Sequence, residues 1–90
     1  MNQDRIVIKK NREMLDKITD DLIKLVYKRG KLVSEIGKAK KHLGIKVVDS
    51  KRESEVLETA REKALAAGVD QNLISEILKL LIKDSRRKQE

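Results

Sequence analysis

The stretch REMLDKITDDLIKLVYKRGKLVSEIGKAK, residues 12–40, decides the fold of this chain. Its apolar side chains recur every three or four residues, which places them on one face of an α-helix. Three cations stand in the same register. We call this face the stripe, and it comprises Arg12, Leu15, Ile18, Leu22, Leu25, Arg29, Leu32, Ile36 and Lys40. Burying an unpaired cation costs several kcal/mol, roughly, so three cations on an apolar face indicate anions that meet them, and a ligand is the expected source.

The helical pattern is long, running from about Asp4 to about His42 without a proline. Such a helix measures about 57 Å, whereas a compact domain of this chain length is about 30 Å across. Gly30 and Gly37 each cost about 1 kcal/mol inside the helix, but neither is followed by residues typical of a turn. Gly37 would also allow a neighbouring helix to approach closely. We therefore expect one continuous helix and a symmetric dimer in which two such helices pair.

The segment HLGIKVV, residues 42–48, ends this pattern and forms a short connector, with Gly44 as the C-terminal stop. Asp49 and Ser50 both offer an N-cap for a second helix, and Ser50 with Glu53 matches the S-x-x-E capping box. The sequence therefore predicts that a second helix begins directly after the connector.

Turn residues separate the second helix from a third. Gly68 fits the position after a helix that ends at about Ala67, and Asp70 fits the next N-cap. The inner face of the second helix comprises Val56, Leu57, Ala60 and Ala64, and that of the third comprises Leu73, Ile74, Ile77, Leu78, Leu81 and Ile82. The predicted fold is all-α, with one long and two shorter helices per chain, a single domain of residues 1–90 and an intertwined homodimer.

The composition excludes several classes of protein. The 90 residues include one Tyr and no Phe, Trp, Pro or Cys, so the core must consist of Leu, Ile, Val and Ala, which suits packed helices. Without cysteine there is no disulfide or thiolate metal site, and His42 alone cannot hold zinc. No apolar run reaches the roughly 18 residues of a membrane span, and the amino terminus lacks the apolar segment of a secretory signal. We therefore expect a cytoplasmic protein that binds no metal.

The net charge of +7 is unevenly distributed, because residues 1–48 carry 13 Lys/Arg against 6 Asp/Glu, whereas residues 49–90 carry 9 of each. A basic half can bind nucleic acid, but the chain has almost no aromatic side chains to stack on bases and no recognisable helix-turn-helix. Attraction of a small anionic substrate fits the same charge. We therefore expect neither a nucleic-acid nor a membrane partner.

Polar residues at core-facing positions form the candidate site. They are Arg12, Arg29 and Lys40 on the first helix, Asp49, Arg52 and Glu53 at the start of the second, and Ser85 and Gln89 at the end of the third. Four cations against two carboxylates suit a small dianion, because Arg forks bind carboxylates bidentately and Lys donates as a point charge. Taken singly, these residues also have plainer roles, as snorkelling cations, helix caps or surface residues at a helix end.

Three short motifs occur in a fixed order. They are R-E-M-L-D-K-I-x-x-x-L from Arg12 to Leu22, G-K-A-K from Gly37 to Lys40, and D-x-x-R-E from Asp49 to Glu53, and the spacing continues without gaps through IKDSRRKQ, residues 82–89. Each motif is weak alone, but the ordered set resembles the all-helical chorismate mutases over nearly the whole chain. Thr19 departs from the family, which usually has Asp there, at a position that is not a substrate contact.

The resemblance implies a dimer of three-helix subunits, an isomerase that converts chorismate to prephenate in aromatic amino acid biosynthesis. Each of its two sites would lie within one subunit and be completed by the first helix of the other. Arg12 would be the residue that the partner subunit contributes to the site. Arg29 and Arg52 would hold the carboxylates of the substrate, with Ser85 assisting.

The remaining roles concern the reacting bond and the ring. The resemblance implies that Lys40 and Gln89 flank the ether oxygen, while Glu53 and the backbone near Asp49 meet the ring hydroxyl. The reaction is a unimolecular pericyclic (Claisen) rearrangement, so no proton need be transferred and no cofactor is required. Lys40 and Gln89 could stabilise negative charge that develops on the ether oxygen, and the arginines could hold the compact conformer of the substrate.

Two alternatives stay open at this point. The isochorismate-pyruvate lyases share the fold, the arginines and the lysine, so an assay with both substrates is needed to separate them. A non-enzymatic basic helical module would explain a dimer but not the cations on the stripe.

Overall fold

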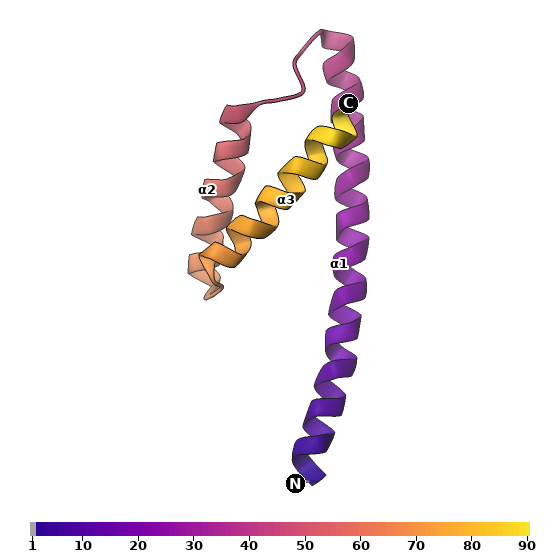
Figure 1. The fold of residues 1–90 in the computed structure, drawn as a ribbon, viewed down its shortest axis with the longest axis vertical. Coiled ribbons are helices and arrows are strands. Elements are labelled where there is room, and N and C mark those ends of the chain that lie inside the picture. Colours follow the sequence, from indigo (N-terminus) through magenta and orange to yellow (C-terminus); the bar gives the residue numbers. More distant parts are fainter. Residues whose placement is uncertain (1) are drawn as a thin grey trace. The chain divides into compact units, whose positions relative to one another are not determined.

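The computed structural model describes residues 2–90, and these residues form three helices and no strand. The helices are α1 (Asn2–Leu43), α2 (Ser50–Ala67) and α3 (Gln71–Gln89), as Figure 1 shows. The all-α class and the order of one long and two shorter helices, predicted from the sequence, are confirmed for this part of the chain. The predicted homodimer and the single domain stay predictions.

The chain divides into two compact units, which we describe separately. The first is the part of α1 up to Lys31. The second runs from Leu32 to Glu90 and contains the end of α1 with α2 and α3. The helix is continuous through Gly30 and Gly37, as predicted, and it begins two residues before the predicted start and ends one residue after the predicted end.

The connector after α1 begins at a left-handed glycine. Gly44 has φ +69°, and its N–H donates to the carbonyl of Lys41 at 3.3 Å. The N–H of Ile45 donates to the carbonyl of Lys40 at 2.8 Å. These bonds satisfy carbonyls that the last helical turn leaves without a partner, which is why the helix stops here. Gly44 is therefore the C-terminal stop that the sequence predicted.

The capping-box prediction for α2 is wrong. The N-cap is Asp49, whose carboxylate accepts a hydrogen bond from the N–H of Arg52 at 3.0 Å. Ser50 is the first residue of the helix, and the Glu53 side chain does not turn back to the cap but pairs with Arg86 on α3. Asp49 precedes Ser50 by one residue and carries a full negative charge at the positive end of the helix. Its carboxylate accepts a hydrogen bond from a backbone N–H that has no partner within the helix.

A tight turn joins α2 to α3, and the two helices pack against each other (Figure 1). Gly68 has φ +72°, and the Asp70 side chain accepts from the N–H of Asn72 at 2.8 Å as the N-cap of α3. Both assignments agree with the sequence. The predicted inner face of α2 is confirmed, since Ala64 is buried and Val56, Leu57 and Ala60 are half-buried. On α3 the prediction is confirmed in part, since Ile74, Leu78, Leu81 and Ile82 are half-buried. Leu73 and Ile77 are exposed, and the buried side chain is that of Ser75.

Ser75 is buried because it is held by an arginine from the other helix. The Arg61 guanidinium donates to the Ser75 hydroxyl at 2.6 Å and to the carbonyl of Gln71 at 3.4 Å. The Gln71 side chain in turn donates to the carbonyl of Arg61 at 3.0 Å. These polar contacts fix the register of α2 against α3 next to the turn, in a place where the sequence pattern predicted apolar contacts.

The stripe is exposed along the first unit. Its aliphatic side chains between the two arginines are 57% to 61% exposed, and they are Leu15, Ile18, Leu22 and Leu25. Single exposed leucines are normal on protein surfaces, but a continuous apolar row on one helix face is typical of an interaction surface. Further along the same helix, in the second unit, Val33 is buried.

Candidate active site

Gln89, at the end of α3, lies against α1. A Cβ atom added to Gly37 would lie 2.7 Å from the Cα atom of Gln89, closer than real Cβ contacts allow. The two helices therefore approach each other as closely as the sequence analysis expected Gly37 to permit. Lys40 is one turn further along α1 and therefore shares the Gly37 face of the helix, which brings it toward the end of α3.

Of the two polar atoms of the Gln89 amide, the nitrogen is hydrogen-bonded within the part of the chain that the structure describes and the oxygen is not. Its Nε2 donates to the carbonyl of Ser85 at 3.2 Å, whereas its Oε1 is buried and accepts no hydrogen bond from residues 2–90. The Ser85 hydroxyl donates to the carbonyl of Leu81 at 2.8 Å. An unpaired buried acceptor costs about 1–3 kcal/mol, so a group that supplies a donor to Gln89 is favoured here.

Lys40 and the connector are joined by one hydrogen bond. The Nζ atom of the half-buried Lys40 donates to the carbonyl of Val47 at 2.9 Å. A lysine ammonium has three donors, so two remain for other acceptors. The bond holds the ammonium at the end of α1, close enough to α2 to lower the pKa of the Glu53 carboxyl through its charge.

Glu53 is held by two hydrogen bonds from α3. Arg86 donates from Nε to one carboxylate oxygen at 2.8 Å and from a terminal nitrogen to the other at 2.5 Å. This pairing lowers the pKa of Glu53 below its ordinary value of 4.5, an effect that partial burial and Asp49 oppose and Lys40 reinforces. The pKa of Arg86 is raised in turn, so both groups are charged at neutral pH. Glu53 is therefore a hydrogen-bond acceptor.

Asp49 and Arg52 stand at the start of α2. The Asp49 carboxylate is occupied as the N-cap, as described above, and the Arg52 side chain is exposed. The second unit thus brings Lys40, Glu53 and Gln89 toward one end of its helices, one from each helix.

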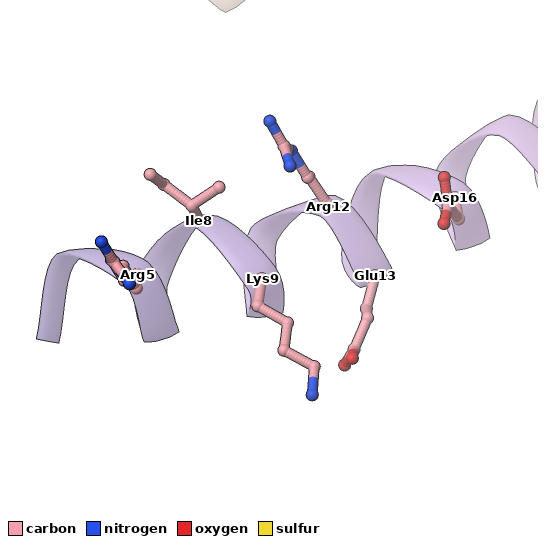
Figure 2. A pocket seen from close by; sticks show the side chains of 6 residues that line it. All are labelled: Arg5, Ile8, Lys9, Arg12, Glu13 and Asp16. Carbon is pink, nitrogen blue, oxygen red and sulfur yellow. The ribbon is translucent and has the colours of Figure 1, made fainter. Parts of the chain in front are cut away.

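The two arginines of the stripe belong to the first unit. Arg29 is half-buried, and Arg12 is exposed. Arg12 lines a hollow of about 380 Å³ with Arg5, Ile8, Lys9, Glu13 and Asp16. In Figure 2, Ile8 and Arg12 extend to one side of the helix, and Lys9 and Glu13 to the other. All six residues come from one helix, so they supply one wall of a binding site at most.

Sequence reasoning missed Arg86 and Arg61. The sequence analysis singled out neither of them, although each bridges α2 and α3. A signal for Arg86 did exist, because position 86 lies one residue after Ser85 and three before Gln89, on the face of α3 that carries the candidate residues. For Arg61 we find no comparable signal in the pattern.

Among residues 2–90, no cluster of His, Cys, Asp or Glu has the arrangement needed to hold a metal ion. Within the same range, none of the helices combines the length and apolarity that a membrane crossing requires.

The fold and the polar residues at the helix ends define a small all-helical protein. Residues 11–90 match the family described as chorismate mutase type II, and the chain belongs to this family. The resemblance stated from the sequence motifs is thereby confirmed.

Three curated relatives support the assignment. The chain is 32% identical over 74 residues to a T-protein of Enterobacter agglomerans and 33% identical over 78 residues to a T-protein of Haemophilus influenzae. These alignments cover 82% and 87% of this chain but 20% and 21% of the relatives, so the chain spans about a fifth of their length. It is 28% identical over 75 residues to a chorismate mutase of Methanocaldococcus jannaschii, covering 83% of this chain and 76% of that protein. No solved structure gives a significant match.

Proposed function

We propose that this chain is a chorismate mutase, an isomerase that converts chorismate to prephenate within aromatic amino acid biosynthesis. Membership of the family supports the reaction class. The observation that carries the proposal is the grouping of Lys40, Glu53 and Gln89, because it offers a donor for an ether oxygen and an acceptor for a hydroxyl. The cytoplasmic location remains a prediction from the sequence.

The proposed mechanism is electrostatic. In the rearrangement one carbon–oxygen bond breaks as a carbon–carbon bond forms, and negative charge develops on the ether oxygen. Lys40 has donors left after its bond to Val47, and the Gln89 amide would donate to the same oxygen once its Nε2 leaves the carbonyl of Ser85. Donors already fixed in place stabilise that charge more in the transition state than in the ground state, which lowers the barrier. Arg29, Arg52 and Ser85 would hold the substrate carboxylates and Glu53 its hydroxyl.

We also propose that the active form is a homodimer with shared sites. Two observations support it. The aliphatic side chains of the stripe are more than half exposed, and Arg12 lines a hollow whose residues all come from one helix. A second copy of α1 would cover the stripe and complete the hollow, and symmetry would repeat the arrangement in both subunits.

The activity is tested by mixing the purified protein with chorismate and following the loss of chorismate absorbance, with prephenate identified as the product. Isochorismate is assayed in parallel. Conversion of chorismate supports the proposal, and release of pyruvate from isochorismate alone would favour the lyase. A protein that leaves both substrates unchanged would contradict the proposed function.

The shared site is tested by complementation between two inactive variants. Arg12→Ala and Arg29→Ala homodimers should both be inactive. If Arg12 serves the site of the other subunit, a heterodimer of the two variants contains one native site and one site with both substitutions. Refolding the variants together at equal amounts gives about half heterodimers by random association, and so about a quarter of wild-type activity per site. If heterodimers form but no activity returns, Arg12 acts within its own chain.

A further inference from the structure

Arg86 contacts both oxygens of the Glu53 carboxylate, and this contact differs from the ion pairs that Asp84 makes within α3. It joins residues 33 positions apart, on α2 and α3, through two short hydrogen bonds. The neighbouring Arg87 makes a single contact of 3.5 Å with Asp84, three residues away on the same helix, and its side chain is 70% exposed. A bidentate fork fixes the plane and direction of a carboxylate, which a single contact does not.

The environment of Glu53 leaves it suited to a ligand. Its side chain is 22% exposed, so the carboxylate is partly desolvated and still accessible. Each carboxylate oxygen has two acceptor positions, and the fork occupies one on each. Glu53 and Arg86 both line a hollow of about 510 Å³ between α2 and α3, to which Lys79 and Lys83 also contribute. A carboxylate held in this way can still accept a hydrogen bond from a hydroxyl.

We propose that Arg86 is a positioning residue of the site, which orients the Glu53 carboxylate so that it accepts the hydrogen bond of the substrate hydroxyl. This inference rests on the proposed function. Arg86 acts through Glu53 and does not touch the substrate. A single ion pair that is still accessible to solvent contributes little to stability, so the value of this pair lies in the geometry that it imposes.

The test compares Arg86→Gln with the matched control Arg87→Gln, which removes the same charge from the next residue along α3. Arg86→Gln should lower kcat/KM by about 10- to 100-fold, because a small misplacement of a binding group costs that much. Arg87→Gln should stay within about twofold of wild type, since surface changes away from such contacts have small effects. Arg86→Lys restores the charge without the fork and should recover activity only in part. Equal values for Arg86→Gln and Arg87→Gln in folded protein would overturn the proposal.

The pH profile separates positioning from a structural role. The charged groups that act on Glu53 are Arg86 from α3, Lys40 from α1 and Asp49 at the start of α2, while Lys79 and Lys83 line the same hollow. Removing the Arg86 charge should raise the pKa of Glu53 and move the acid limb of the kcat/KM profile to higher pH. Arg87→Gln should leave that limb in place. An unmoved limb in Arg86→Gln would contradict the proposal.

A double substitution shows whether Arg86 acts through Glu53. Glu53→Gln should lower kcat/KM by itself, and adding Arg86→Gln should change it by less than about threefold, because the partner of Arg86 is already lost. Fully additive losses would mean that Arg86 acts elsewhere. The Glu53 pKa, measured by carboxyl NMR with and without Arg86, needs no activity. If the wild-type protein does not convert chorismate, the proposed function falls, and the NMR titration alone decides whether Arg86 controls the carboxylate.

Discussion

The N-terminal part of α1 and the α2–α3 pair differ in which side chains they leave exposed and which they pair. In the first, the aliphatic side chains of the stripe stay more than half exposed. In the second, arginines and short polar side chains bridge the two helices, and the connecting turns are closed by glycines and aspartates. One region leaves its apolar face exposed, whereas the other pairs several of its polar groups across the two helices.

This difference indicates how a small chain can build a site. A domain of this size buries about 60 to 65% of its unfolded surface, which gives a marginal core. Pairing two copies along α1 would add the missing core, while the α2–α3 pair would position the polar groups. Assembly would then depend on the aliphatic side chains of the stripe and catalysis on the polar side chains, and substitutions can separate them.

The largest effect should follow from a charge on the stripe. Leu22→Asp would place a carboxylate in the proposed dimer interface, where an unpaired buried charge costs several kcal/mol, roughly. We expect loss of the dimer and of activity, measured by sedimentation at micromolar concentration and by the chorismate assay. Lys24→Asp introduces the same side chain in the same turn but off the stripe, and it should remain dimeric and active. A folded, active monomer of Leu22→Asp would contradict the role in assembly assigned to the stripe.

The next largest effect should be a loss of catalysis in a protein that still assembles. Lys40→Ala and Gln89→Ala should each lower kcat by about a hundred- to a thousandfold, or about 3 to 4 kcal/mol of barrier, because both donors are proposed to act on charge that develops in the transition state. Sedimentation should show unchanged dimers, and the unfolding midpoint should move little. A modest loss of kcat in Lys40→Ala would remove the role assigned to it.

A smaller effect should come from the close approach of α1 and α3. Gly37→Ala gains about 1 kcal/mol of helix propensity but forces overpacking that costs about 1–3 kcal/mol. The atom in the way is the backbone Cα of Gln89, so α3 must shift and kcat should fall by about 10- to 100-fold. Gly44→Ala is the control, because its added Cβ meets open space and its cost of about 1–2 kcal/mol comes from the left-handed backbone. Kinetics for Gly37→Ala that match those of Gly44→Ala would refute this account.

The smallest effect is the pH dependence of the Glu53–Arg86 pair. Folding lowers the pKa of Glu53, so the pair contributes stability above the ordinary carboxyl pKa of 4.5 and loses it as the pH falls through the lowered value. The difference in unfolding free energy between wild type and Glu53→Gln should therefore shrink toward acid pH. Denaturant titrations at several pH values and one protein concentration measure it. A difference that grows toward acid pH would mean that the sign is wrong.

The sequence predicted local structure well because the deciding signals are local. Gly44, Gly68, Asp49 and Asp70 mark helix ends through their own backbone preferences and short side chains, and the structure uses all four. The stripe predicted a continuous α1 for the same reason, since its period depends on neighbours three and four residues away.

The errors arose where a side chain had two possible partners. Glu53 could cap its own helix or reach Arg86, and the local pattern favoured the cap, whereas the structure has the long-range pair. Ser75 was not considered for the core because a polar residue is buried only when a partner satisfies it, and Arg61 is 14 positions away. Such pairings depend on how the helices pack against each other. The periodicity within one helix carries no information about that packing.

The contacts between α2 and α3 also suggest an order of folding. The pairs between the two helices lie 10 positions apart for Arg61 and Gln71, 14 for Arg61 and Ser75, and 33 for Arg86 and Glu53. Closing a short loop costs less chain entropy than closing a long one, and low contact order speeds folding. We expect the α2–α3 pair to form from the Gly68 turn outward, so that Glu53 meets Arg86 late. The candidate site would then be among the last parts of the pair to form and the first to open.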